Sequence, residues 1–241
     1  PSVRDQSLTI LATVQGEGTL TATASFEGKE MGCTEVYARG GVVALSVLLE
    51  EKHLWEVGKG GLYDLELTMI DAEGNVTDTV TSYFGLREVG LTKKGMTING
   101  KYVFGRWVLD QGFYPDGIYT ASTADELEAD IDRSLAMGFN GARLHQKVFE
   151  ERFLYYCDKH GYLVWGEHGN WGLKLSQPTV WKGYFQEWRE IVLRDVNHPS
   201  IIGWCPLNET NKDQDPEFIR SLVDLTKTLD PTRPVIDSSG W

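Results

Sequence analysis

Five stretches of the sequence place polar side chains together directly after a short apolar run. They are Asp110-Gln111, Arg143–Gln146, Trp165–His168, Asn208-Glu209 and Asp237–Ser239. Together they supply carboxylates, an arginine, two histidines, side-chain amides and tryptophan. Carboxylates and histidines can transfer protons, whereas amides and arginine donate hydrogen bonds to oxygen atoms. One carboxylate after a strand is usually a loop residue or a helix cap, so the convergence of all five stretches is what predicts a site.

The elements that must position these residues alternate between strand and helix after Gly90. Apolar patterning predicts strands over 102–109, 140–144, 162–165, 201–205 and 233–237, and helices over 125–137, 149–160, 180–196 and 216–229. Thr123 is a candidate N-cap with Glu126 three residues later, and Gly138 a candidate C-terminal stop. Such alternation predicts a parallel sheet covered by helices, and in barrels of this type functional residues follow the carboxyl ends of the strands.

The number of strands favours an incomplete barrel. Five strands are too few for a closed (β/α)8 TIM barrel. An open doubly wound sheet is the alternative, but no glycine-rich phosphate loop follows any of the strands. We therefore predict that residues 89–241 form the N-terminal part of a TIM barrel that ends after about five strands.

Residues 1–88 carry a different pattern, in which short strands follow one another without helical periodicity. Strands are predicted over 7–15, 19–26, 42–50, 62–71 and 76–84. Gly16-Glu17-Gly18 is a turn signal between the first two, and Ala72–Asn75 is a hairpin turn between the last two. This spacing is typical of a small antiparallel β-sandwich, so we predict such a domain over residues 1–88.

Composition and charge exclude two classes of partner. The formal net charge of −12 argues against nucleic acid, since phosphate neutralisation needs clustered lysine and arginine, and against anionic membrane surfaces. No apolar run approaches the roughly 20 residues that span a bilayer. Eight tryptophans, with nine phenylalanines and ten tyrosines, can build cores and the flat platforms on which sugar rings stack. Cys33, Cys157 and Cys205 lie far apart in apolar surroundings, and we expect buried free thiols.

Several segments resemble those of one enzyme family in the order in which that family carries them. Asn197–Glu209, which reads Asn-His-Pro-Ser-Ile-Ile-Gly-Trp-Cys-Pro-Leu-Asn-Glu, resembles the signature of glycoside hydrolase family 2 at the fourth barrel strand. Leu54–Leu65 resembles the Trp…Leu-Tyr segment of the family's immunoglobulin-like domain. Tyr83–Arg87 and Ile98–Lys101 resemble its junction into the barrel. The resemblance covers roughly residues 50 to 241 and implies that the predicted sandwich is immunoglobulin-like.

The resemblance also implies a reaction and roles for individual residues. The reaction is retaining hydrolysis of a β-glycosidic bond in a carbohydrate substrate, as in a β-galactosidase, with Glu209 as acid and later as base. Asn208 would bind the sugar hydroxyl next to the reacting carbon, and Arg143 would orient the catalytic carboxylates. His145 is either a substrate contact or a core histidine. The rest of the predicted substrate-binding set is Gln146, Trp165 as a pocket wall, Glu167 as a hydroxyl ligand, and Asp110.

The sequence departs from the family's pattern in three places. Many members have Arg-x-Ser-His after the second strand, and here Gln146 stands where that histidine would be, which indicates a variant pocket. The magnesium-binding sequence of some family β-galactosidases has no counterpart in Trp165–Gly172, so we predict neither a metal nor a cofactor. The family's nucleophile is a second glutamate after the seventh strand, beyond Trp241. We therefore expect this piece to be inactive alone, because Glu167 and Asp110 come too early in the fold for that role.

Two other functions compete with this one. A non-catalytic carbohydrate-binding or interaction protein could use the same strand ends. An amidase or other hydrolase would need a nucleophilic serine or cysteine beside a base, but Ser238 and Ser239 lack an elbow motif and Cys205 lies within an apolar run. Barrel edges left exposed predict a homo-oligomer. The lack of a signal-peptide or disulfide pattern favours a cytoplasmic location.

Overall fold

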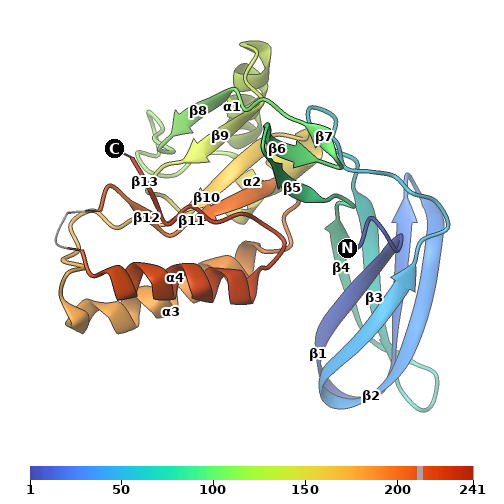
Figure 1. The fold of residues 1–241 in the computed structure, drawn as a ribbon. Helices are drawn as coiled ribbons and strands as arrows, with labels where there is room; N and C mark the ends of the chain where they lie inside the picture. Colours follow the sequence, from blue (N-terminus) through green and yellow to red (C-terminus); the bar gives the residue numbers. More distant parts are fainter. Residues whose placement is uncertain (211–213, 241) are drawn as a thin grey trace. The chain divides into compact units, whose positions relative to one another are not determined.

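The computed structural model describes residues 1–210 and 214–240, and the chain divides into two compact units (Figure 1). The first unit comprises residues 1–56 and 61–88, and the second comprises residues 57–60 and 89–241. Trp241, the predicted end of the barrel part, lies outside the described residues.

The first unit is built on a four-stranded antiparallel sheet. Its strands are β1 (Ser7–Phe26), β2 (Lys29–Leu48), β3 (Tyr63–Ile70) and β4 (Val76–Phe84), in the order β2-β1-β3-β4. The predicted hairpin turn at Ala72–Asn75 is confirmed, because Ile70 pairs with Val76 across it. Within 1–56 and 61–88, all of which the structure describes, there is no separate second sheet. The prediction of antiparallel strands is confirmed, but β2 also includes residues 29–41, for which no strand was predicted, and the predicted two-sheet sandwich is not present.

The predicted turn at Gly16–Gly18 is wrong, because β1 runs through it as one strand of 20 residues. The register of β1 against β2 shifts between Val14 and Glu17, which is a β-bulge. Gly16 has φ +90, so the glycine bends the strand without reversing it. Buried residues on both sides of the bulge, such as Leu8 and Leu20, belong to the same hydrophobic cluster. One bent ribbon therefore encloses the core that two sheets were predicted to enclose.

The second unit combines a small antiparallel sheet with a parallel sheet and helices. The small sheet holds β5 (Val89–Thr92), β6 (Gly95–Ile98) and β7 (Lys101–Tyr102). The parallel sheet has the order β11-β10-β9-β8, and a pair of two-residue strands, β12 and β13, lies beyond Cys205. In chain order these elements are β8 (Trp107–Asp110), α1 (Ala124–Ala136), β9 (Gly141–Leu144), α2 (Glu151–His160), β10 (Leu163–Glu167), α3 (Trp181–Asp195), β11 (Ile201–Cys205), β12 (Leu207–Asn208), α4 (Pro216–Leu229) and β13 (Ser238–Ser239).

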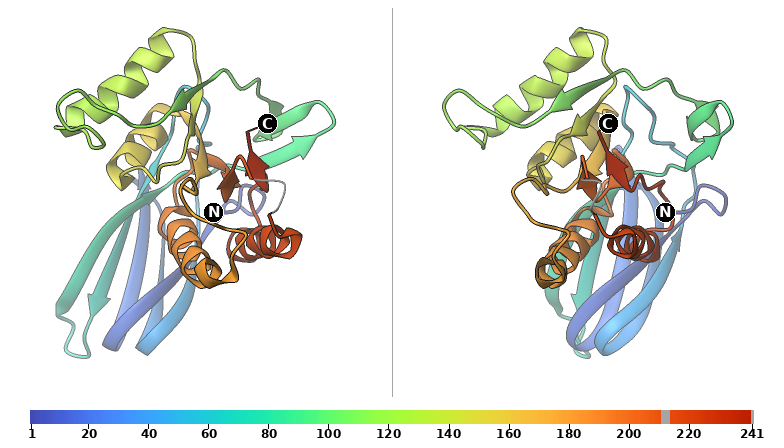
Figure 2. Two further views of the ribbon diagram at one scale, coloured as in Figure 1. Left: turned by 90° about the vertical axis from the view of Figure 1, so that its left-hand side faces the viewer. Right: turned by 60° about the vertical axis from the view of Figure 1, so that its left-hand side comes forward.

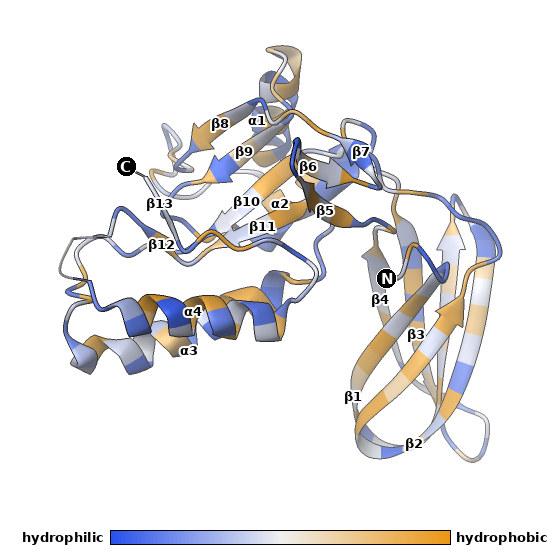
Figure 3. Ribbon diagram, viewed as in Figure 1, coloured by the Kyte–Doolittle hydropathy of each residue, from blue (hydrophilic) through white to orange (hydrophobic). Residues whose placement is uncertain are grey.

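Three helix ends carry an identifiable cap, and the N-cap predicted at Thr123 is confirmed. Thr123 accepts a hydrogen bond from the Glu126 amide at the start of α1. Gly161, with φ +66, ends α2 in the left-handed conformation. Asp215 caps α4, which has the predicted bounds Pro216–Leu229. Both views of Figure 2 show α3 and α4 side by side. Figure 3 shows apolar and polar residues alternating along α4, as an amphipathic helix requires.

Two predicted strands differ from the structure for local reasons. The strand predicted over 102–109 is divided, because the Asn140 side chain binds the Phe104 carbonyl and the Arg106 amide and keeps 103–106 out of the sheet. The strand predicted over 233–237 is reduced to a single bridge between Trp204 and Val235. Pro234 has no N–H to donate. The chain enters regular pairing again at β13, which lies parallel to β12.

Two glycines allow the parallel strands to pack with tryptophans on both faces. A Cβ on Gly203 would collide with the Trp165 ring, and a Cβ on Gly166 would lie 2.7 Å from the Trp204 ring. Trp204 belongs to the cluster packed under the helices. Because side chains alternate along a strand, Trp165 and Glu167 lie on the face opposite to Gly166. The sheet therefore has one helix-covered face and one face that carries the polar residues. None of the helices among the described residues is long and apolar enough to cross a membrane.

We expect Gly138→Ala and Gly183→Ala to change the free energy of unfolding in opposite directions. A Cβ at either position would meet no atom within 4 Å, so backbone conformation decides the outcome. Gly138 has φ +90, where alanine costs about 1 kcal/mol. Gly183 lies inside α3, where alanine is favoured by about 1 kcal/mol. Urea unfolding followed by tryptophan fluorescence reports the second unit, since every tryptophan except Trp55 lies after residue 88. Shifts of the same sign would contradict the prediction.

Candidate active site

The polar face of the sheet is organised by an ion pair between Arg143 at the end of β9 and Glu167 at the end of β10. Arg143 Nε donates to Glu167 Oε2 over 2.8 Å, and Nη2 lies 3.2 Å from Oε1. Two parallel N–H donors on two carboxylate oxygens are the bidentate geometry that arginine favours. β9 and β10 pair in parallel, which places the two strand ends next to each other.

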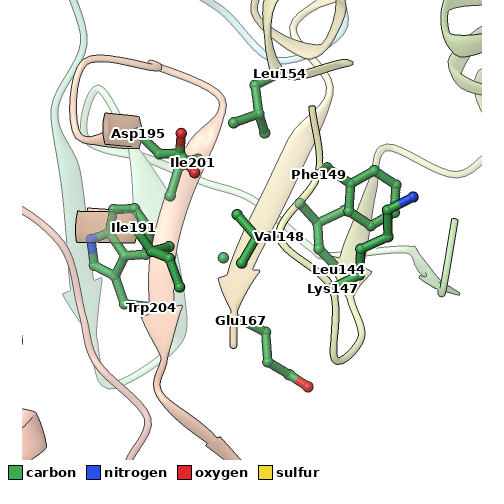
Figure 4. Close-up of a pocket in the computed structure, with 11 residues that line it drawn as sticks. Leu144, Lys147, Val148, Phe149, Leu154, Glu167, Ile191, Asp195, Ile201 and Trp204 are labelled. Atoms are coloured by element: carbon green, nitrogen blue, oxygen red, sulfur yellow. The ribbon is translucent and has the colours of Figure 1, made fainter. Parts of the chain in front are cut away.

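Glu167 has no exposed side-chain surface and relies on the protein for all of its hydrogen bonds. Besides Arg143, the Gln146 amide donates to Oε1 over 3.2 Å and Ser239 Oγ donates to Oε2 over 3.0 Å. Figure 4 shows the Glu167 side chain pointing away from Leu154 and Phe149, which line a cavity with it. Its carboxylate is thus fixed by three donors from two strand ends, those of β9 and β13. Its predicted role as a hydroxyl ligand stays a prediction.

Asn208 joins the same network from the end of β12. Arg143 Nη2 donates to Asn208 Oδ1, and Ser239 Oγ lies 3.3 Å from the same oxygen. The residue has no exposed surface, yet its Nδ2 has no hydrogen-bond partner among the described residues. A buried N–H donor without a partner costs about 1–3 kcal/mol. This nitrogen is therefore a buried hydrogen-bond donor that no described residue uses.

Glu209 follows Asn208 and leaves the strand in a strained conformation. Its φ of +48 lies in the left-handed region that glutamate rarely adopts. Its amide donates to the Ser239 carbonyl over 2.6 Å, and a Cβ on Gly240 would collide with Glu209 Cγ. Half-buried Glu209 lines a cavity of about 260 Å³ together with Asn170, Lys174, Ser176 and Gln214. Glu209 is thus a half-buried carboxylic acid at the wall of a polar cavity.

His145 and Gln146 lie on the other side of Arg143. His145 Nδ1 is 3.1 Å from Arg143 Nη2 and 3.4 Å from Glu167 Oε1. The ring is buried and meets Trp171 edge to face, with centroids 5.7 Å apart. Gln146 has φ +56, the second strained strand end of the site, and its Nε2 is buried without a partner among the described residues. Backbone strain of this kind clusters at functional sites.

The remaining two predicted residues make their contacts elsewhere. Trp165 is 9% exposed and packs against Trp107, with ring centroids 6.0 Å apart. Asp110 accepts a hydrogen bond from the Gly112 amide in its own loop. Burial raises the pKa of the Asp110 carboxyl, and the nearby Asp130 adds to the effect. The structure thus brings Arg143, His145, Gln146, Glu167 and Asn208 into one network, with Glu209 adjacent, whereas Asp110 is bound within its loop.

Sequence reasoning missed the parts played by Ser239 and Asn170. Ser239 was considered as a nucleophile, but its hydroxyl accepts from Arg143 Nη2 over 2.5 Å and donates to Glu167. Asn170 uses its side-chain amide to bind the backbone of Asn208. The position of Ser239 after the fifth predicted strand was a usable signal. Nothing in the pattern around Asn170 set it apart from an ordinary loop asparagine.

The described residues contain no group of three or more His, Cys, Asp or Glu side chains arranged to hold a metal ion. His168 follows β10 but turns to the helices, where it stacks on Tyr184 with centroids 4.6 Å apart. Burial lowers the pKa of His168, and Glu187 partly offsets this. The cysteines are free, and Cys33 is exposed, so the expectation that all three are buried is wrong for this residue. It lies on β2, where alternate side chains face solvent.

We expect Arg143→Ala to lower the free energy of unfolding by about 3 kcal/mol, because it leaves the buried Glu167 carboxylate without its cation. Arg133→Ala is the matched control. Its ion pair with Asp130 measures 2.7 Å, but the two side chains are 68% and 37% exposed. Exposed pairs contribute less than about 1 kcal/mol. Urea unfolding of both variants compares the two losses, and equal losses would contradict a central role for the Arg143–Glu167 pair.

Comparisons with known proteins agree with this arrangement. The family model described as "Glycosyl hydrolases family 2, TIM barrel domain" matches residues 89–240, and the model "Glycosyl hydrolases family 2" matches residues 2–87. The β-galactosidase of Pseudoalteromonas haloplanktis is 27% identical over 98% of this chain and 24% of its own length. The β-glucuronidase of Rattus norvegicus is 30% identical over 83% of this chain and 32% of its own length. The chain thus spans about a quarter to a third of these relatives.

Solved structures show the same fold at lower identity. A β-glucuronidase from Ruminococcus gnavus in complex with D-glucuronic acid has a TM-score of 0.81 and 23% identity, over 95% of this chain and 40% of that one. The β-glucuronidase of Parabacteroides merdae has a TM-score of 0.83 and 23% identity, over 95% of this chain and 31% of that one. The barrel-domain model alone covers more than half of the sequence. The parallel sheet, whose strand ends converge on Arg143, is consistent with part of a TIM barrel. This chain belongs to glycosyl hydrolase family 2.

Proposed function

We propose that the protein to which this chain belongs hydrolyses β-glycosidic bonds with retention, and that Glu209 is its acid/base. The observation that carries the proposal is the position of Glu209, which follows Asn208 in a left-handed backbone conformation and lines a polar cavity of about 260 Å³. In the first step the Glu209 carboxyl donates its proton to the leaving oxygen. In the second step the carboxylate takes a proton from water.

Asn208 is proposed to bind the sugar in this reaction. Its Oδ1 is held by Arg143 and Ser239, which leaves the buried Nδ2 as a donor without a protein partner in the described part of the chain. A sugar hydroxyl next to the reacting carbon can accept this hydrogen bond. Because Arg143 is itself fixed on Glu167, the donor is oriented before the sugar arrives.

The second carboxylate of a retaining mechanism must lie about 5 Å from the first. Glu167 is a poor candidate, because its oxygens already accept from Arg143, Gln146 and Ser239 and its side chain has no exposed surface. We assign the nucleophile to no residue among 1–210 and 214–240, and we propose that the isolated chain is inactive.

The sugar is proposed to be a β-galactoside, with a β-glucuronide as the alternative. Both activities appear in the names of the relatives. The variant run around Gln146 gives no reason to prefer either, so a panel of aryl β-glycosides on the whole protein is the discriminating measurement. We further propose that residues 1–88 are an immunoglobulin-like domain in which a single bent four-stranded sheet encloses the core.

Glu209→Gln in the whole protein should lower kcat on aryl β-glycosides by about 10²–10⁴-fold, the contribution of a general acid/base. Glu217→Gln is the control, since that side chain is 75% exposed on α4 and should leave kcat unchanged. Binding of sugar without turnover by the wild type would favour the carbohydrate-binding function instead. Turnover by residues 1–241 alone that is abolished by Glu209→Gln would overturn the proposed inactivity.

Residues 1–241 purified alone should self-associate through β8. This strand pairs with β9 on one side and forms the edge of the parallel sheet. Leu109 on it is 56% exposed, and an exposed apolar edge strand favours pairing with a second copy. Light scattering should show an average mass that rises with protein concentration. At the same concentration, Leu109→Lys should have a lower average mass than the wild type. A wild-type monomer at all concentrations would refute the prediction.

A further inference from the structure

Asn170 forms two hydrogen bonds with the backbone of one residue, Asn208. Its Nδ2 donates to the Asn208 carbonyl over 2.9 Å, and the Asn208 amide donates to its Oδ1 over 2.8 Å. A side-chain amide thus takes the place that the peptide group of a neighbouring strand would take. Asn170 is 7% exposed and Asn208 is fully buried, so water does not compete for these bonds.

This contact is needed because regular pairing ends at this point. β12 has two residues, and it pairs with β13 through Leu207–Ser238 and Asn208–Ser239. The next residue, Glu209, has φ +48, which persists only when the surrounding structure enforces it. The Ser239 carbonyl holds the Glu209 amide. Asn170 holds both backbone groups of the residue before it.

Asn170 is itself fixed by the end of another strand. Gln146 Oε1 accepts from the backbone N–H of Asn170 over 2.7 Å and from the backbone N–H of Trp171 over 3.2 Å. Gln146 in turn donates its own amide to Glu167. A continuous chain of hydrogen bonds therefore runs from the Arg143–Glu167 pair through Gln146 and Asn170 to the residue before Glu209.

We propose that Asn170 is a positioning residue that fixes the direction of the Glu209 carboxyl group toward the leaving oxygen. The proposal rests on the proposed acid/base role of Glu209. Without the Asn170 side-chain amide, the backbone of Asn208 loses both hydrogen bonds to Asn170. The Glu209 carboxyl group that follows is then no longer held in one orientation. Proton donation suffers first, because it depends on a geometry of tenths of an ångström. Sugar binding by other groups suffers less.

The test is a series of aryl β-glycosides with leaving groups of different basicity, measured on the whole protein with Asn170→Ala. A basic leaving group needs the acid, whereas 2,4-dinitrophenolate leaves without it. For an aryl glycoside whose phenolate leaving group is strongly basic, we expect kcat to fall about 100-fold with KM nearly unchanged. We expect a far smaller loss for the dinitrophenyl glycoside in its glycosylation step. A merely structural defect would lower the activity on both substrates equally, and that result would overturn the proposal.

Asn140→Ala is the matched control. Asn140 also binds the backbone through both side-chain atoms, but across two residues: Nδ2 donates to the Phe104 carbonyl over 2.9 Å, and the Arg106 amide donates to Oδ1 over 2.8 Å. It precedes β9, at the opposite end of the strand from Arg143. This variant should lose stability without any dependence on the leaving group. The same dependence in both variants would also overturn the proposal.

Hydrogen exchange gives a readout that does not require activity. In Asn170→Ala, backbone amides in a peptide spanning residues 205–210 should exchange faster than in the wild type. In Asn140→Ala the faster exchange should appear around residues 104–106. Unchanged exchange at 205–210 in Asn170→Ala would refute the hold on Asn208. A wild-type protein that hydrolyses no glycoside while these exchange changes occur would refute the proposed function and leave the backbone contact standing.

Discussion

The site depends on one buried ion pair. The Glu167 carboxylate is fully buried and would be costly without a cation, and the partly buried Arg143 supplies that cation. Arg143 Nη2, which already contacts Glu167, also donates to Asn208 and Ser239, and Glu167 accepts from Gln146 and Ser239. Strand ends far apart in the sequence are thereby held at fixed positions. Asn208, whose Nδ2 has no partner among the described residues, is oriented through its contact with Arg143.

Rigidity of this kind suits the proposed chemistry. A general acid works when its proton already points at the leaving oxygen, because no reorganisation is then needed during the reaction. The two strained strand ends, Gln146 and Glu209, lie on either side of the pair. Strain at these points is a local cost that packing and hydrogen bonding elsewhere must offset. The parallel sheet under the helices provides that support.

The sequence predicted those parts of the fold that depend on local patterns. The bounds of α4 and β11 are as predicted, because a capping residue, a proline at the first turn and an unbroken apolar run are local signals. The strand over 102–109 failed because Asn140, more than 30 residues away, binds that segment. The prediction of a turn at Gly16–Gly18 was wrong because glycine is favoured in β-bulges as well as in turns. Arg143, Glu167 and Asn208 meet as expected, whereas the contact made by Asn170 arises only in three dimensions.

The packing of Trp165 on Gly203 and of Trp204 on Gly166 has a consequence for how this sheet can vary. Each ring fills the space that a Cβ on the opposing strand would need. Neither glycine can become larger unless the tryptophan facing it becomes smaller, since a close-packed interior has no spare volume. The two neighbouring strands therefore constrain each other position by position. A larger residue at Gly166 or Gly203 therefore requires a smaller residue at the tryptophan that it faces.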